Sequence, residues 1–290
     1  MVTAAVAASI VATIGVGSKP CGSAAARSYL YQADYGAGTL SKIDPRTNRV
    51  VKTSRVGLAP CGVVFGGGSL WVEDYFDDTI VQVAPGSMRV LRKIAVGNSP
   101  WDVAYGFGAV WSSNWKDGTV SRIDAQTRKV VQTIRTGGTP ACIRTGFGSV
   151  WVGSQGGAFI FRIDAATNRV TRVRVGHDGE LCVDVNRTGV WVSDSAHHSV
   201  TRLDPRTNKT VATVPVPGSP ADGVRGPDGL EWIPLQGAPG KIARIDPTTN
   251  RLVDTVRVAG FTFVVRSAFG SLWAGDFQGS TLYRIAPSKR

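Results

Sequence analysis

The sequence contains few of the residues on which disulfide-rich scaffolds and zinc proteins depend. Its 290 residues include four cysteines, three histidines and two methionines. Four cysteines are too few for a dense disulfide scaffold, and no two of them have the CxxC spacing of a zinc site. No apolar run reaches the roughly 18 residues that argue for a membrane-spanning segment, so the sequence predicts none.

Helical patterns are also missing, together with the enzyme motifs that depend on them. We find no glycine-rich phosphate or dinucleotide loop that passes from a strand into a helix, and no G-x-S-x-G turn for a serine nucleophile. A TIM barrel would need helical patterns between its strands. The chain has 35 glycines, 15 prolines and 42% hydrophobic residues, which is enough for a large core with many turns.

The sequence is rich in internal repetition. A motif related to SRID recurs, and its apolar third residue advances in steps of 40, 40, 40, 40, 42 and 40 residues. These apolar residues are Ile43, Val83, Ile123, Ile163, Leu203, Ile245 and Ile285. A large aromatic residue precedes each motif, here called the repeat aromatic: Tyr31, Trp71, Trp111, Trp151, Trp191, Trp232 and Trp273. The sequence therefore contains seven copies of one repeat unit.

Each unit predicts four short β-strands. Runs such as AVWSSN, TVSRID and KVVQTIRTG are rich in β-branched residues and are separated by Gly, Asp, Asn and Pro. The DPRTN and DPTTN stretches are typical of turns. Four strands in about 40 residues is the period of a propeller blade. We therefore predict an all-β fold, a seven-bladed β-propeller of four-stranded blades.

The beginning of the chain is predicted to complete the last blade. Residues 11–22, VATIGVGSKPCG, match residues 51–62, VKTSRVGLAPCG, at seven of 12 positions. The last unit ends after its third strand, so an N-terminal outer strand would close the ring and leave no unpaired edges. Blade 7 would then be residues 261–290 plus about 9–17, and residues 1–290 would form a single propeller.

The apolar start is also open to a second interpretation, a signal peptide with AAA at 24–26 as its cleavage site. That segment lacks a basic leading region, and its removal would delete the first inner strand. A third interpretation makes residues 1–7 the tail of a longer export signal, missing or truncated here. We favour a folded role for residues 9–17 and an extracytoplasmic protein, secreted or periplasmic.

The units resemble YVTN-type β-propeller repeats. The matching stretches are the SLWV or AVWS strand, residues 117–134 and residues 96–108. The resemblance covers essentially the whole chain, and it implies a propeller that serves as an extracytoplasmic binding scaffold.

A more distant resemblance is to virginiamycin B lyase-like propellers, whose blade signature is similar to GPDGLEW at 226–232. That family linearises cyclic streptogramin B antibiotics with a histidine base and Mg²⁺ held by glutamate. The matching positions in this chain are Phe263 and Phe277, so the resemblance does not carry the lyase residues over.

Loop residues that differ between units are the candidate ligand site. In a propeller, the loop before each first strand and the loop between the second and third strands lie on one face, here called the loop face. Six aromatic residues fall in these loops on the neighbouring blades 7, 1, 2 and 3. They are Tyr35, Tyr75, Trp101, Trp115, Phe263 and Phe277. We predict that they bind a ring or a peptide, although they could instead pack over the central channel.

All three histidines fall on the same face of blade 5. His177 precedes its first strand, and His197 and His198 lie between its second and third strands, with Glu180 and Asp194 nearby. Imidazole acts as a base near neutral pH, and carboxylates hold divalent metals. These five residues are the catalytic candidates of an alternative function, a Mg-dependent lyase or hydrolase. The other interpretation, which we favour, is that these histidines are solvated loop residues.

The formal charge of +12 permits an anionic partner. Lys and Arg fall mostly on third and fourth strands, whereas the predicted loop face is rich in acids. We therefore do not expect a nucleic-acid partner, because single-strand binders need a basic groove with stacking rings. We expect a monomer that binds a small molecule, a peptide or a protein without a cofactor.

The cysteines occupy related repeat positions on adjacent blades. Cys21 and Cys61 share one position, and Cys142 and Cys182 share the next. This arrangement favours disulfides in an oxidising compartment. Buried free thiols remain the alternative, because bridged Cα atoms must lie within about 7 Å of each other.

Overall fold

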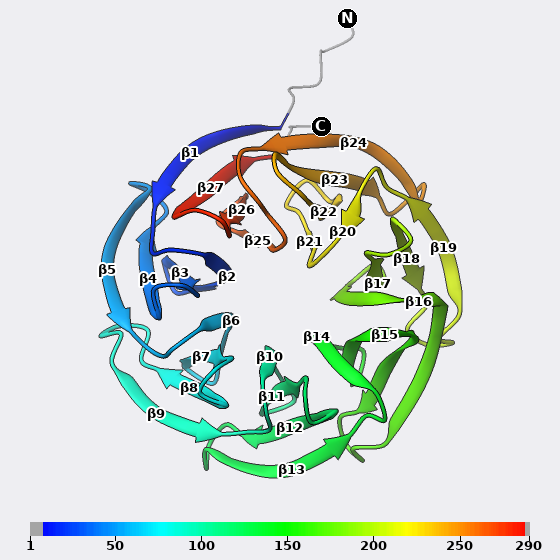
Figure 1. The fold of residues 1–290 in the computed structure, drawn as a ribbon, viewed down its shortest axis with the longest axis horizontal. Helices are drawn as coiled ribbons and strands as arrows, with labels where there is room; N and C mark the ends of the chain where they lie inside the picture. The colour runs from blue at the N-terminus through cyan, green and yellow to red at the C-terminus, as the bar shows by residue number, and fades with distance from the viewer. Residues whose placement is uncertain (1–7, 288–290) are drawn as a thin grey trace, which may run out of the picture.

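The computed structural model describes residues 8–287, except for the side chain of His177. Its antiparallel sheets follow one another in chain order around a common axis (Figure 1). The first three sheets have the predicted four strands each. Blade 1 consists of β2 (Pro20–Ala26), β3 (Tyr29–Asp34), β4 (Thr39–Asp44) and β5 (Arg49–Arg55). Blade 2 consists of β6 (Pro60–Gly66), β7 (Ser69–Asp74), β8 (Thr79–Val83) and β9 (Val90–Ala95). Blade 3 consists of β10 (Pro100–Gly106), β11 (Ala109–Asn114), β12 (Thr119–Asp124) and β13 (Lys129–Arg135).

Blades 4 and 5 are joined into one six-stranded sheet. Its strands are β14 (Thr139–Gly146), β15 (Ser149–Asp164), β16 (Val170–Asn186), β17 (Gly189–Asp194), β18 (Ser199–Leu203) and β19 (Thr210–Pro215). The long β15 and β16 continue through positions where the repeat predicted turns. Glycine permits the close approach of these two backbones, since a Cβ at Gly153 would lie 2.0 Å from the carbonyl oxygen of Leu181.

Blade 6 has a divided inner strand. It consists of β20 (Ser219–Pro220), β21 (Val224–Arg225), β22 (Glu231–Gln236), β23 (Gly240–Asp246) and β24 (Arg251–Val258). With blade 7, the described chain forms the seven units that the repeat predicted, and the all-β propeller fold is confirmed.

Blade 7 closes the ring with strands from both ends of the described chain. It consists of β25 (Val265–Ala268), β26 (Ser271–Asp276), β27 (Thr281–Ala286) and β1 (Ser9–Gly15). β1 pairs antiparallel with β27, and the two ends of the described chain lie beside each other (Figure 1). The predicted closing strand is thus confirmed, while the suggested export-signal tail at 1–7 lies outside the described residues.

The repeat aromatics form the packing between blades. The six repeat tryptophans and Tyr31 are at most 1% exposed. The indole Nε1 of Trp71 donates to the carbonyl of Gly66 at 3.0 Å, and Trp111 makes the same bond to Gly106 at 3.1 Å. Burying so large a ring with its only polar atom paired explains why the repeat keeps this residue type.

An arginine on the third strand links most blades to the next. Arg162 lies over the ring of Trp151, 4.8 Å from its centre, and donates to Pro205 O at 2.7 Å and Asn208 Oδ1 at 2.8 Å. Asn208 has φ of +59°, a conformation that asparagine tolerates. The same link recurs from Arg122, Arg202 and Arg284. These third-strand arginines are half-buried, so they connect blades and do not simply face solvent.

Both cysteine pairs are disulfides between adjacent blades. The Cα atoms are 5.0 Å apart for Cys21–Cys61 and 5.1 Å apart for Cys142–Cys182, within the range for a disulfide. Of the two alternatives, disulfides or free thiols, the structure has disulfides, which are consistent with an oxidising compartment. Among residues 8–287, no helix is long and apolar enough to cross a membrane.

Each disulfide should contribute strongly to stability. Each cross-link spans a sequence separation of 40 residues, for which the chain-entropy model gives about 4 kcal/mol. We expect the double variant Cys21→Ala with Cys61→Ala to lower the free energy of unfolding by about that amount, measured by urea denaturation. A variant lacking all four cysteines should no longer respond to reductant. A wild-type urea midpoint that reductant leaves unchanged would contradict this expectation.

Candidate functional site

A cavity of about 570 Å³ opens among the inner strands and the turns of the loop face. One side of it is aromatic, with contributions from blades 7, 1, 2 and 3. Among the described residues, blades 5 and 6 contribute no aromatic residue to the lining, and their polar members are Glu180, Asp222 and Gln236. Its volume suits a small molecule or a few peptide side chains. Both disulfides contribute to the lining, so covalent links between blades hold the walls of this cavity.

The aromatic side is an unbroken chain of neighbouring rings, here called the aromatic arc. In order, its members are Trp115, Trp101, Tyr75, Phe76, Tyr35, Phe277, Phe263 and Phe261. Successive ring centres lie between 4.8 Å, for Phe263–Phe277, and 6.2 Å, for Tyr75–Trp101. Their planes are tilted or edge-on, the arrangement that aromatic quadrupoles favour.

All six aromatic residues predicted from the loops belong to this arc. Five of them line the cavity, whereas Trp115 packs against Trp101 at 5.8 Å and is not part of the lining. The indole Nε1 of Trp115 is buried without a hydrogen-bond partner. Sequence analysis missed Phe76 and Phe261. Phe76 stands five residues after its repeat aromatic, where the other units have residues such as Gly36 and Lys116. An aromatic residue at this position was the signal in the sequence that could have identified it.

Glu73, on β7, is another residue of the cavity lining. Its side chain is fully buried, and Oε2 accepts a hydrogen bond from the Gly62 amide at 2.8 Å. The other oxygen, Oε1, has no hydrogen-bond partner. Burial, together with the nearby carboxylates of Asp102 and Asp74, raises the pKa of Glu73 well above its usual value.

A chain of ion pairs crosses the ring next to this carboxyl. Arg144 donates to Asp102 at 2.5 Å and to both oxygens of Asp222 at 2.6 and 2.8 Å. Arg266 also donates to Asp222, at 2.5 Å. Burial opposes ionisation of Asp222, but the two arginines outweigh it and hold its pKa below the usual value. The two cations are thus engaged by Asp102 and Asp222.

A second polar group adjoins the ion pairs. Asn186 donates to Asp184 at 2.8 Å and to Glu231 at 2.9 Å, and Arg225 donates to Glu231 at 2.9 Å. Burial, followed by the charge of Asp184, raises the pKa of Glu231 to about 7. Sequence analysis did not single out these residues. The signal was present seven positions before the repeat aromatic, where blades 4 to 7 carry Arg144, Asp184, Arg225 and Arg266 and blades 1 to 3 carry apolar residues.

The blade 5 candidates are not gathered into one site by the described side chains. His197 Nδ1 pairs with Asp194 at 3.0 Å within its own turn, and the exposed His198 lies 3.3 Å from Ser219 Oγ. Neither histidine lines the cavity, whereas Glu180 does and accepts a hydrogen bond from Gln155 at 3.4 Å. The side chain of His177 lies outside the described part of the structure.

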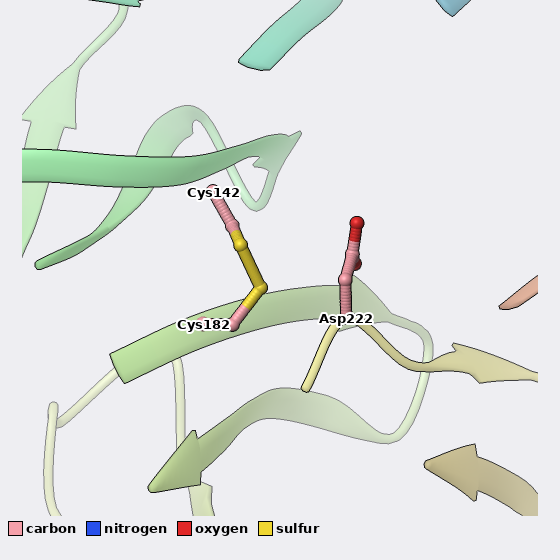
Figure 2. A group of neighbouring side chains, drawn as sticks. All are labelled: Cys142, Cys182 and Asp222. Atoms are coloured by element: carbon pink, nitrogen blue, oxygen red, sulfur yellow. A yellow bond between two sulfur atoms is a disulfide. The ribbon is translucent and has the colours of Figure 1, made fainter. Parts of the chain in front are cut away.

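Among the described side chains, the blade 5 candidates do not come together as a group of three possible metal ligands. Within the described residues, one group of three possible metal ligands comes close together, Cys142, Cys182 and Asp222 (Figure 2). The two sulfur atoms are bonded to each other, so they offer no thiolate, and Asp222 is already paired with two arginines. Among the blade 5 acids, Asp194 is held by His197 and its own turn.

The fold is that of β-propellers with known structures. Virginiamycin B lyase from Staphylococcus aureus aligns with a TM-score of 0.82 and 13% identity, over 96% of this chain and 99% of that chain. A catalytically inactive histidine-to-alanine variant of that lyase with quinupristin gives a TM-score of 0.81 and 13% identity over the same shares. Kuenenia stuttgartiensis hydrazine synthase gives 0.80 and 16% identity, over 92% of this chain and 95% of that chain.

No protein-family model matches the sequence, and no curated protein matches it. At such low identity, the structural likeness defines a class of fold and not an activity. The chain is therefore a β-propeller whose function must be argued from its own cavity.

Proposed function

We propose that this protein is a non-enzymatic binding propeller that holds a ligand or a partner segment against the aromatic arc. The observation that carries this proposal is the continuity of the arc along one side of the 570 Å³ cavity. Aromatic side chains present large, rigid apolar faces at low entropic cost, which suits them to rings and to peptide side chains. The YVTN-type resemblance of the repeats agrees with a scaffold role.

The disulfides support a place outside the cytoplasm for this scaffold. They connect neighbouring blades at the cavity itself, so the binding surface depends on oxidation. A reducing cytosol would open structural disulfides of this kind. We therefore place the protein in a secreted or periplasmic compartment, where it acts as a monomer and without a metal.

Ligand screening tests the proposal directly. We expect aromatic fragments, detected by ligand-observed NMR, to bind the wild-type protein, and Tyr75→Ala to weaken their binding by about tenfold through lost ring contacts. Chelation with EDTA should leave the affinity unchanged. The matched control is Phe147→Ala, which removes an exposed phenylalanine from the β14–β15 turn at the other end of its blade. Equal losses in both variants would overturn the proposal.

The alternative function is a metal-dependent lyase or hydrolase that uses blade 5. The structural likeness to virginiamycin B lyase and the position of Glu180 in the cavity lining favour it. Two observations weigh against it. The positions that the resemblance assigns to the lyase histidine and glutamate are Phe263 and Phe277, which pack edge-on at 4.8 Å, and His197 and His198 do not line the cavity.

Mass spectrometry separates the two functions. A streptogramin B antibiotic incubated with the protein and Mg²⁺ should remain cyclic if the protein is a binding propeller. A linear product that forms with Mg²⁺ and disappears with EDTA or with His197→Ala would establish the alternative in its place.

A further inference from the structure

Among the described acids of the cavity lining, Glu73 is the one with a buried oxygen, Oε1, that has no hydrogen-bond partner. No ion pair within the described part of the chain neutralises it, whereas Asp102 and Asp222 are paired with arginines. The side chain of Glu73 is fully buried, and Glu73 is one of the residues that line the cavity. A buried carboxyl oxygen without a partner costs free energy, so it calls for a ligand that supplies one. The charged groups that act most strongly on Glu73 are two further acids, Asp102 and Asp74.

The nearby cations are already committed to other acids. Arg144 is shared between Asp102 and Asp222, and Arg266 pairs with Asp222. A carboxyl of Glu73 in its ionised form would therefore be neutralised by a cation that enters the cavity from outside.

The aromatic arc, which lines the same cavity as Glu73, has the complementary property. Rings of Tyr35, Tyr75 and Trp101 border the same cavity, and the faces of aromatic rings attract cations. A cavity lined both by aromatic rings and by a carboxyl that can ionise matches a substituted ammonium group. A neutral apolar ligand would use the rings and leave Oε1 unpaired.

We infer that the cavity selects cationic ligands, amines or quaternary ammonium compounds with an apolar body, and that Glu73 supplies their counter-charge. This inference rests on the proposed binding function and specifies its ligand class. The rings hold the apolar body, and Glu73 discriminates charge.

A pair of probes of the same shape tests the inference. Phenyltrimethylammonium is a cation, and tert-butylbenzene is its neutral carbon analogue. We expect the wild-type protein to bind the cation at least tenfold more tightly, as measured by ligand-observed NMR. Glu73→Gln should weaken binding of the cation by about tenfold and change binding of the neutral probe by less than about twofold. Asp124→Asn, the same change of acid to amide at the β12–β13 turn, at a residue that does not line the cavity, is the matched control and should preserve the preference for the cation.

The pH dependence gives a second readout that a purely structural role would not produce. Because the pKa of Glu73 is raised, the carboxyl is neutral below that pKa and binds a cation better as the pH rises through it. The titratable groups facing Glu73 are Asp74 on its own strand, Asp102 on β10 and Tyr35 on the blade 1 turn. Affinity of the wild-type protein for phenyltrimethylammonium should rise with pH, and that of Glu73→Gln should rise less. Equal profiles in the two proteins would overturn the inference.

The outcomes separate this inference from the proposed function. If both probes bind equally and both are lost in Tyr75→Ala, the aromatic cavity is a binding site and the inference about charge is wrong. If Glu73→Gln loses both probes equally, Glu73 is a structural residue and the inference is also wrong. If neither probe binds at millimolar concentration and the aromatic fragments fail as well, the proposed function and the inference fall together.

Discussion

Arg144→Met should destabilise the protein by about 3–5 kcal/mol, the cost of leaving buried charges without their partner. Arg144 is the shared donor to Asp102 and Asp222, and the two acids are less than 10% exposed. Methionine keeps much of the apolar volume of the arginine side chain. The measured loss of stability therefore comes mainly from the missing charge and not from a cavity. Urea denaturation at pH 7 measures it. A loss below about 1 kcal/mol would show that the acids find other partners.

The loss in Arg144→Met should also depend on pH with a definite sign. Arg144 is the first of the two cations that hold the pKa of Asp222 below its usual value, so removing it raises that pKa. In the wild type, a carboxyl whose folded pKa is lowered stabilises the fold above its unfolded pKa, and this contribution is lost as the pH falls through the folded pKa. The variant has less of this contribution to lose, so its deficit relative to wild type should shrink as the pH falls below the usual pKa of an aspartate. Arg266→Met is the matched control with a smaller expected loss, because Asp222 then keeps Arg144.

Deleting residues 1–17 should remove most of the stability of the ring. The deletion leaves β27 as an unpaired edge and removes Ile14, which is 3% exposed and packs in a cluster with Leu30 and Trp273. We expect a loss of about 5 kcal/mol or more, comparable to the whole stability of an ordinary domain, with aggregation through the open edge. Thermal unfolding and size-exclusion chromatography measure both effects.

Two further experiments sharpen the test of the closing strand. A synthetic peptide of residues 8–19 added to the deleted chain should pair with β27 and restore its thermal unfolding transition. Within β1, Ile14→Ala should cost about 2–5 kcal/mol, whereas Val11→Ala, at a residue 52% exposed, should cost far less. Equal costs at the two positions would mean that β1 adds no buried contact to the blade.

The repeat made the fold and the aromatic arc predictable. Comparison of equivalent positions showed where a unit departs from its neighbours, and a propeller brings equivalent loops of adjacent blades side by side. Tyr75 and Trp101 were found in this way because both occupy loop positions that differ between units. The structure then places their ring centres 6.2 Å apart.

The ion pairs were not predicted because the comparison of repeat units considered loop positions. Arg144 and Arg266 lie on inner strands, where a sequence pattern does not tell whether a side chain points into a channel or into a blade. Glu73 has the same difficulty, since its significance comes from an oxygen without a partner, which the sequence cannot show. The disulfides were undecided for a related reason. They depend on how closely neighbouring inner strands approach, which is set by the radius of the whole ring.

The arginine links between blades have a consequence for how the protein unfolds. Arg284 of blade 7 donates to Asn48 of blade 1 at 2.9 Å, the same bond that Arg162 makes to Asn208 inside the chain. A linear repeat array has terminal units with one neighbour, and unfolding starts there. In this ring, the junction of first and last blades is fastened like an interior one. Among residues 8–287, every blade therefore has a neighbour on both sides, and the blades should unfold together in one cooperative step.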